Sequence, residues 1–123
     1  MNFNHPPTFF QNLGKLFYAI STADGTINEN ESTVVLELVH SLKKQNLYSD
    51  QIEITFNALA KSNSSSTTCF NEFVTFKNKN KSLFTPEINH FIIEIAGAIA
   101  SSFSKRNKSE LILLAKLELE LKK

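Results

Sequence analysis

Three carboxylates gather around an Asp-Gly pair near the start of the chain. Asp24 and Gly25 form the pair, and Glu29 and Glu31 follow it closely. Carboxylate oxygens are the ligands that hard cations such as Ca²⁺ and Mg²⁺ prefer, so this segment could hold one divalent cation. With at most three carboxylates in reach, such a site would be open and its affinity low. The candidate metal ligands are therefore Asp24, Glu29 and Glu31.

The spacing of this segment overlaps the last part of an EF-hand calcium loop. Asp24 would occupy position 5 of the loop, Gly25 position 6 and Glu31 position 12. In that register, position 1 falls on Ile20 and position 3 on Thr22. An EF-hand needs an oxygen ligand at position 1, and the Ile20 side chain has none. The register therefore argues against an EF-hand.

Helix capping explains the same residues without a metal. Asn28 and Glu31 have the spacing of a capping box, in which the Asn side chain accepts from the Glu31 amide and the Glu31 side chain accepts from the Asn28 amide. Glu29 and Glu31 would also lie at the positive end of the helix dipole. Gly25 suits a tight turn between helices. Capping alone and cation binding are both consistent with these residues.

Apolar periodicity predicts helices through almost the whole chain. The first helix should start near Pro7, and six large apolar residues fall on one of its faces: Phe9, Phe10, Leu13, Leu16, Phe17 and Ile20. Further helices are expected after Asn28, from Ser49 or Asp50, over 69–80, from Pro86 and after Asn107, with a polar loop at 63–68. The sequence predicts an all-α fold, in which residues 1–123 form a single compact domain of six to seven helices.

The two ends of the chain resemble each other at a shift of 79 residues. The shift places Asn28 on Asn107 and Glu31 on Glu110, so each copy reads as a helix, a turn and a second helix that opens with Asn-x-x-Glu. We expect a degenerate internal duplication of helical hairpins packed about a pseudo-twofold axis. Asp24 falls on Phe103, so only the first copy has the carboxylate in its turn.

An alanine-containing helix runs into Ala-Asp-Gly-Thr-Ile at 23–27, and Glu31 follows seven residues after the aspartate. In this motif the chain resembles the tellurite-resistance TerB-like family. The resemblance covers residues 13–45, and residues 88–121 as the degenerate second copy. It implies an all-helical domain with no established enzymatic activity and an association with stress-response or membrane-linked complexes.

The family resemblance also implies an acidic site for a divalent cation. It carries over to Asp24 and Glu31, with Glu29 adjacent. Phe103 and Ser104 occupy the equivalent turn of the second copy, so a metal cluster with ligands from both copies is not expected. No cofactor is required by this interpretation, and Ca²⁺ or Mg²⁺ would be a weakly bound ligand.

Composition and charge exclude several classes of protein. The chain has a net charge of +1, far from the strong positive field of a dedicated nucleic-acid binder, although residues 61–123 hold ten basic and six acidic residues. Eleven Phe and no Trp predict that Phe fills the large core positions. Cys69 is the only cysteine, which excludes an intrachain disulfide, and we expect it to be a small buried residue. The start of the chain lacks a signal sequence and no segment approaches 18 consecutive apolar residues, so a cytoplasmic location is expected.

The other candidate residues are histidines and two basic patches. His5, His40 and His90 are far apart in the sequence and are expected to pack or to face solvent. The basic patches comprise Lys77, Lys79 and Lys81, and Lys105, Arg106 and Lys108. They lack interleaved aromatic residues and are expected to be solvated helix ends.

The sequence predicts a small intracellular module without enzymatic activity that binds protein partners, which could include a peripheral membrane complex. Two alternatives come from other classes of protein. One is a metal-assisted enzyme, which would need more carboxylates than this segment offers. The other is a nucleic-acid-binding regulator that uses the basic patches of the C-terminal half.

Overall fold

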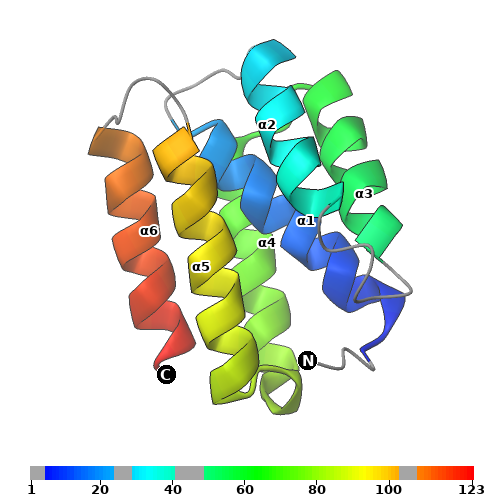
Figure 1. Cartoon of the computed structure of the whole chain (residues 1–123). Helices are drawn as coiled ribbons and strands as arrows, with labels where there is room; N and C mark the ends of the chain where they lie inside the picture. The colour runs from blue at the N-terminus through cyan, green and yellow to red at the C-terminus, as the bar shows by residue number, and fades with distance from the viewer. Residues whose placement is uncertain (1–4, 24–28, 41–48, 103–107) are drawn as a thin grey trace.

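The structure is a computed structural model that describes residues 5–23, 29–40, 49–102 and 108–123. Six α-helices and one short 3₁₀ helix occur among these residues, and no strand does: α1 (Pro7–Ser21), α2 (Glu29–His40), α3 (Ser49–Lys61), α4 (Ser66–Lys79), η2 (Lys81–Leu83), α5 (Pro86–Ser102) and α6 (Lys108–Leu121) (Figure 1). The predicted all-α fold in one compact domain is confirmed. The helix starts expected at Pro7, after Asn28, at Ser49, at Pro86 and after Asn107 are confirmed as well.

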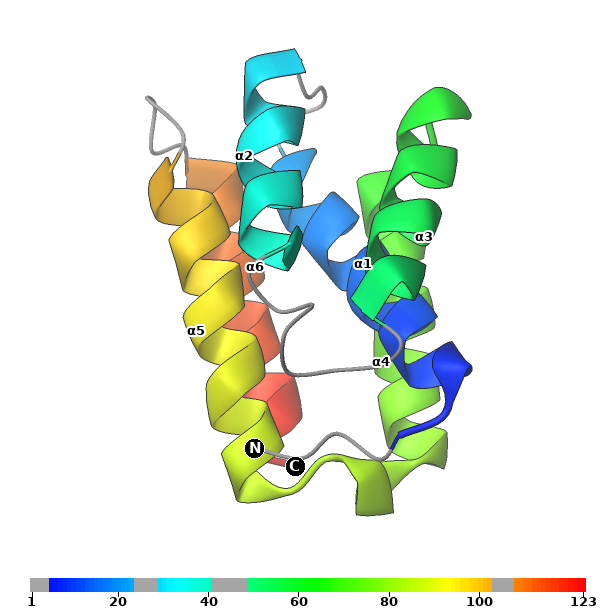
Figure 2. The same cartoon turned by 45° about the vertical axis from the view of Figure 1, so that its right-hand side comes forward.

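Helix α1 runs diagonally through the middle of the bundle, with α5 and α6 on one side and α3 and α4 on the other (Figure 2). It packs against each of the other five α-helices. The six apolar residues predicted for its buried face are all at most 1% exposed. Asn12, Tyr18 and Ala19 on its other sides are buried too, because neighbouring helices surround it. The sequence pattern predicted one buried face, whereas the packing buries most of the helix.

Gly14 lets α1 and α3 approach each other closely. A Cβ atom at this position would lie 2.9 Å from the backbone oxygen of Ile52 and 2.9 Å from Cβ of Thr55. Non-bonded carbon atoms pack at about 3.5–4.0 Å, so a larger residue would push the two helices apart. The close contact between α1 and α3 therefore depends on having glycine, which has no side chain, at position 14.

Phenylalanine fills most of the large core positions, as the composition predicted. The largest fully buried side chains include Phe9, Phe10, Phe17, Phe56 and Phe73. Phe84, just after η2, stacks on Phe9 with ring centroids 5.4 Å apart and meets Phe73 edge-on at 5.9 Å. Aromatic pairs in these geometries stabilise the fold by more than the burial of their apolar area alone would. The turn between α4 and α5 is thereby tied to the start of α1.

Helix α4 begins earlier than the sequence predicted. The predicted loop at 63–68 is wrong over its last three residues, because the helix starts at Ser66. The Ser65 hydroxyl oxygen accepts a hydrogen bond from the Thr68 amide at 3.2 Å, and the Ser66 hydroxyl donates to the Ala19 carbonyl at 2.8 Å. The serine-rich segment therefore caps a helix and ties it to α1.

The helix bounds agree with the predicted repeat of 79 residues. Both α1 and α5 begin at a proline, Pro7 and Pro86, and the first residues of α2 and α6 are separated by the same number of positions. Ile20 and its counterpart Ile99 are both fully buried. Helices α1 and α2 pack together, as do α5 and α6. In the two hairpins the helices thus begin at equivalent positions, and the equivalent residues Ile20 and Ile99 both lie in the core.

Candidate functional site

The predicted metal ligands fall largely outside the part of the chain that the structure describes. Asp24 and the rest of the turn, 24–28, lie outside it, and so do the side chains of Glu29 and Glu31. The backbone places Glu29 and Glu31 in the first turn of α2, as the sequence predicted. Among the described residues, no three His, Cys, Asp or Glu side chains lie together as a possible metal site. Because this statement does not include the three predicted ligands, the cation site stays a prediction.

Cys69, His90 and His5 are the cysteine and histidine side chains that the structure describes, and their surroundings show burial, an ion pair and a hydrogen bond. Cys69 is free, 1% exposed and buried, and burial raises the pKa of its thiol, with the nearby Glu72 carboxylate adding to the effect. A thiol of this kind is a poor nucleophile. His90 is exposed, and its Nε2 lies 3.0 Å from Oε1 of Glu94, one turn later in α5. The Nε2 atom of His5 forms a hydrogen bond of 2.9 Å with the Leu83 carbonyl oxygen. These expectations of packing or solvent exposure are confirmed for Cys69 and His90.

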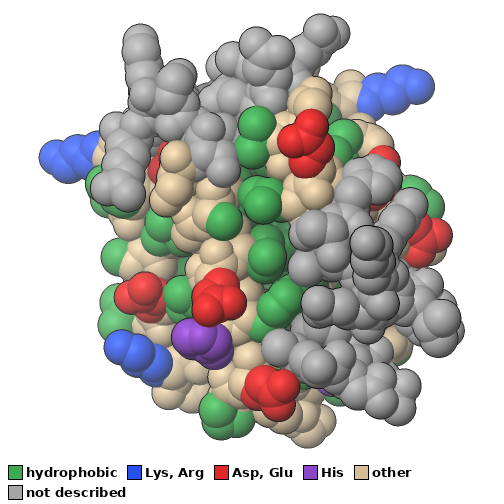
Figure 3. Space-filling view, viewed as in Figure 1, with side chains coloured by type: hydrophobic (Ala, Val, Ile, Leu, Met, Phe, Trp, Pro, Cys, Tyr) green, Lys and Arg blue, Asp and Glu red, His purple; other side chains and the backbone are tan. Residues whose placement is uncertain are grey.

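One predicted basic patch loses a member to the core. Lys77 is only 2% exposed, and its ammonium group donates to the Glu120 carbonyl in α6, so its assignment to a solvated helix end is wrong. Lys79, Lys81 and Lys108 are exposed, and residues 105–106 lie outside the described part. On the face shown in Figure 3, the visible lysine side chains lie at the margins, whereas acidic and hydrophobic side chains occupy its middle. This face offers no continuous cationic surface among the side chains it shows.

Helix α6 carries a second apolar stripe on the side opposite its buried face. It buries Glu110, Leu117 and Leu121 against the bundle. Leu111, Ile112 and Leu119 are 49%, 48% and 63% exposed, and they share the outer face with Ala115. Positions 111, 115 and 119 repeat every four residues, which places them on one line along the helix. An amphipathic surface helix usually has one such stripe, so the outer one is not needed for the fold.

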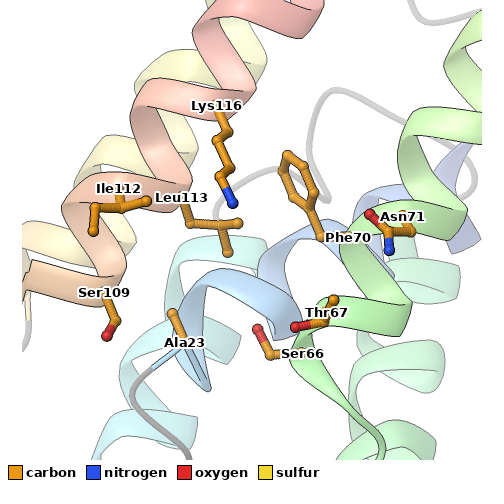
Figure 4. Close-up of a pocket in the computed structure, with 9 residues that line it drawn as sticks. All are labelled: Ala23, Ser66, Thr67, Phe70, Asn71, Ser109, Ile112, Leu113 and Lys116. Atoms are coloured by element: carbon orange, nitrogen blue, oxygen red, sulfur yellow. The ribbon is translucent and has the colours of Figure 1, made fainter.

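A pocket of about 260 Å³ lies beside this stripe, between α6 and the first turns of α4 (Figure 4). Its apolar lining consists of Ala23, Phe70, Ile112 and Leu113, and its polar lining of Ser66, Thr67, Asn71, Ser109 and Lys116. Lys116 extends from α6 into the gap, and Phe70 approaches from α4. Lys116 is the single charged residue of this lining. Such a surface can bind an apolar group and a negative charge at the same time.

This pocket could not be inferred from the sequence. The sequence predicts a helix after Asn107, and the packing turns its Leu111 outward while it buries Glu110 and Leu117. The sequence does contain one indication of an exposed apolar surface: residues 111–114 are all apolar, and one buried face of a helix cannot hold four consecutive residues. On the α4 side, Ser66 and Thr67 were assigned to a loop, whereas Phe70 and Asn71 fell in the predicted helix; no local pattern places them beside α6.

Comparisons of the chain with protein-family models, with curated proteins and with solved structures give no match. No helix among the described residues combines the length and the apolar character needed to cross a membrane.

Proposed function

We propose that this chain is a small TerB-like helical module that acts by binding a protein partner and does not itself catalyse a reaction. The proposal includes the cytoplasmic location and the link to stress-response or membrane-associated complexes that the family resemblance implies. The observation that supports it most is the outer apolar stripe of α6. Contiguous apolar surface that the fold does not need is typical of interaction sites.

The distribution of exposed apolar side chains supports this assignment. Four large hydrophobic residues of the described part are exposed: Ile54, Leu111, Ile112 and Leu119. Three of them lie on α6, whereas Ile54 stands on α3. Single exposed hydrophobic residues are ordinary on protein surfaces, but several of them on one side of a helix favour a surface that binds another helix or an extended peptide.

The alternatives receive less support from the described residues. The lining of the pocket between α4 and α6 contains no Asp, Glu, His or Cys, and Lys116 is its single candidate for a general acid or base. The basic patch at 77–81 keeps only two exposed lysines, because Lys77 is buried. That patch alone offers fewer phosphate contacts than a nucleic-acid site usually has. Both observations favour a protein partner.

A capture experiment tests the proposal. The tagged chain, the double variant Leu111→Gln with Leu119→Gln, and the matched control Ile54→Gln would be used to recover proteins from a lysate of the native cells, with and without EDTA. We expect one partner to be recovered by the wild type and by the α3 control but lost with the α6 double variant. Equal recovery by all three proteins, or no specific recovery by any, would overturn the proposal. The EDTA arm reports separately whether a divalent cation takes part.

A further inference from the structure

The pocket between α4 and α6 is continuous with the outer apolar stripe of α6. Ile112 belongs to both, because it lines the pocket and is 48% exposed on the helix surface. The pocket volume of about 260 Å³ is below the usual range for small-molecule sites, roughly 300–1,000 Å³. A cavity of this size at the edge of an apolar stripe suits one anchoring side chain of a larger partner.

The apolar part of the pocket determines which anchor it accepts. Phe70 is 7% exposed and forms a wall on α4, while Leu113 faces it from α6 (Figure 4) and Ile112 also lines the pocket. Ala23, two residues after the end of α1, adds a small apolar side chain. A branched or aromatic side chain would exchange water for carbon contacts on several sides. The anchor is therefore a residue such as Leu or Phe.

The charged part of the pocket determines what must accompany that anchor. Within the described part of the chain, Lys116 forms no ion pair and no hydrogen bond, and no carboxylate lines the pocket. The hydroxyls of Thr67 and Ser109 and the amide of Asn71 stand around the same opening. The lysine can therefore pair with a carboxylate from outside, and the polar side chains can bond to peptide groups beside it.

We propose that this pocket receives an acidic segment of the protein partner, in which an apolar side chain packs against Phe70 and Leu113 while a neighbouring carboxylate pairs with Lys116. The inference rests on the proposed function, because it names the chemistry of the partner at the same face of α6. The partner segment continues along the stripe formed by Leu111, Ala115 and Leu119. The charge complementarity at Lys116 distinguishes this occupant from a neutral or basic segment.

Three blocked dipeptides test the chemistry directly. Amide chemical shifts of the protein would be followed during titration with N-acetyl-Leu-Glu-amide, with N-acetyl-Leu-Gln-amide, which lacks the charge, and with N-acetyl-Gly-Glu-amide, which lacks the anchor. We expect the first dipeptide to shift the signals of 66–71 and 109–116. Each of the other two dipeptides should bind at least about fivefold more weakly than the first, because each lacks one of the two contacts. Equal responses to all three dipeptides, or no response in these ranges, would overturn the inference.

A charge reversal with a matched control supplies the second test. Lys116→Glu should abolish the response to N-acetyl-Leu-Glu-amide, whereas Lys122→Glu, an equal change of charge at an exposed position directly after the end of α6, should retain it. Shifts at the pocket that depend on protein concentration alone would identify a second copy of this chain as the occupant and would contradict the inference. A captured partner that needs Leu111 and Leu119 but not Lys116 would overturn the inference and leave the proposed function standing.

Discussion

The Lys77 ammonium group donates a hydrogen bond to the backbone carbonyl of Glu120, although the two residues lie 43 positions apart in the sequence. This bond fastens the last turn of α4 to the last turn of α6. Lys77 is 2% exposed, and burial lowers its pKa, against the opposing effect of the nearby Glu120 carboxylate. A residue that reads as part of a solvated lysine run is thus a structural element of the core.

Truncation of Lys77 should destabilise the fold. Lys77→Ala removes the hydrogen bond to the Glu120 carbonyl and the packing of the aliphatic stem, and we expect a loss of about 1–3 kcal/mol in the free energy of unfolding. Lys77→Met keeps much of the stem and should lose less. Lys79→Ala, on the same helix but exposed, is the control and should change the stability by no more than about 0.5 kcal/mol. Urea unfolding followed by circular dichroism measures all three, and equal losses for the two alanine variants would contradict the role of Lys77.

The same lysine should make stability depend on alkaline pH. Its pKa in the folded protein is below the ordinary lysine value of 10.5, so between the two values the unfolded chain binds the proton and the folded protein does not. The contribution of Lys77 to the free energy of unfolding therefore increases as the pH rises through this window. Lys77→Met lacks the titrating group and serves as the reference.

The measurement is the difference in free energy of unfolding between the wild type and Lys77→Met at several pH values from neutral up to 10.5. We expect this difference to move in favour of the wild type as the pH rises. Tyr18 and Cys69, whose pKa values are raised mainly by burial, titrate in both proteins and cancel in the comparison. A difference that stays constant or moves toward the variant would contradict the expectation.

The two described helical glycines should respond to alanine in opposite directions. Gly14→Ala places a Cβ atom 2.9 Å from the Ile52 backbone oxygen, which cannot rotate away, so we expect a loss of about 1–3 kcal/mol. At Gly97 a Cβ atom would meet nothing within 4 Å, so Gly97→Ala should gain about 0.5–1 kcal/mol from the better helix propensity of alanine. Thermal unfolding of the two variants checks this, and a neutral Gly14→Ala would show that α1 and α3 can separate without loss.

The Asp-Gly segment should reveal a cation by its amide signals. If Asp24, Glu29 and Glu31 bind Ca²⁺ or Mg²⁺, millimolar concentrations of the cation should shift the amide resonances of 23–32, and Asp24→Asn should reduce that response. Glu37→Gln, an exposed position further along α2, is the control and should leave it unchanged. Helix capping alone predicts no response to either cation. Absence of shifts in 23–32 would therefore assign these carboxylates to capping.

The sequence by itself determined where most of the helices begin, because these signals are local. Proline at the first position starts α1 and α5, and the Thr85 hydroxyl oxygen accepts from the Ile88 amide at 3.2 Å, as a cap at that position should. The apolar face of α1 could also be predicted, since a period of 3.6 residues places its large side chains on one side of the helix. The repeat of 79 positions followed from the same local patterns.

Only the tertiary structure decided which side chains face solvent and which lie together. The burial of Lys77 depends on a carbonyl in α6, and the exposure of Leu111 depends on how α6 turns against the bundle. The pocket around Lys116 needs α4 and α6 side by side, with Ala23 beneath them. Such contacts join residues tens of positions apart, and their energies depend on packing between helices, which no periodicity along one helix encodes.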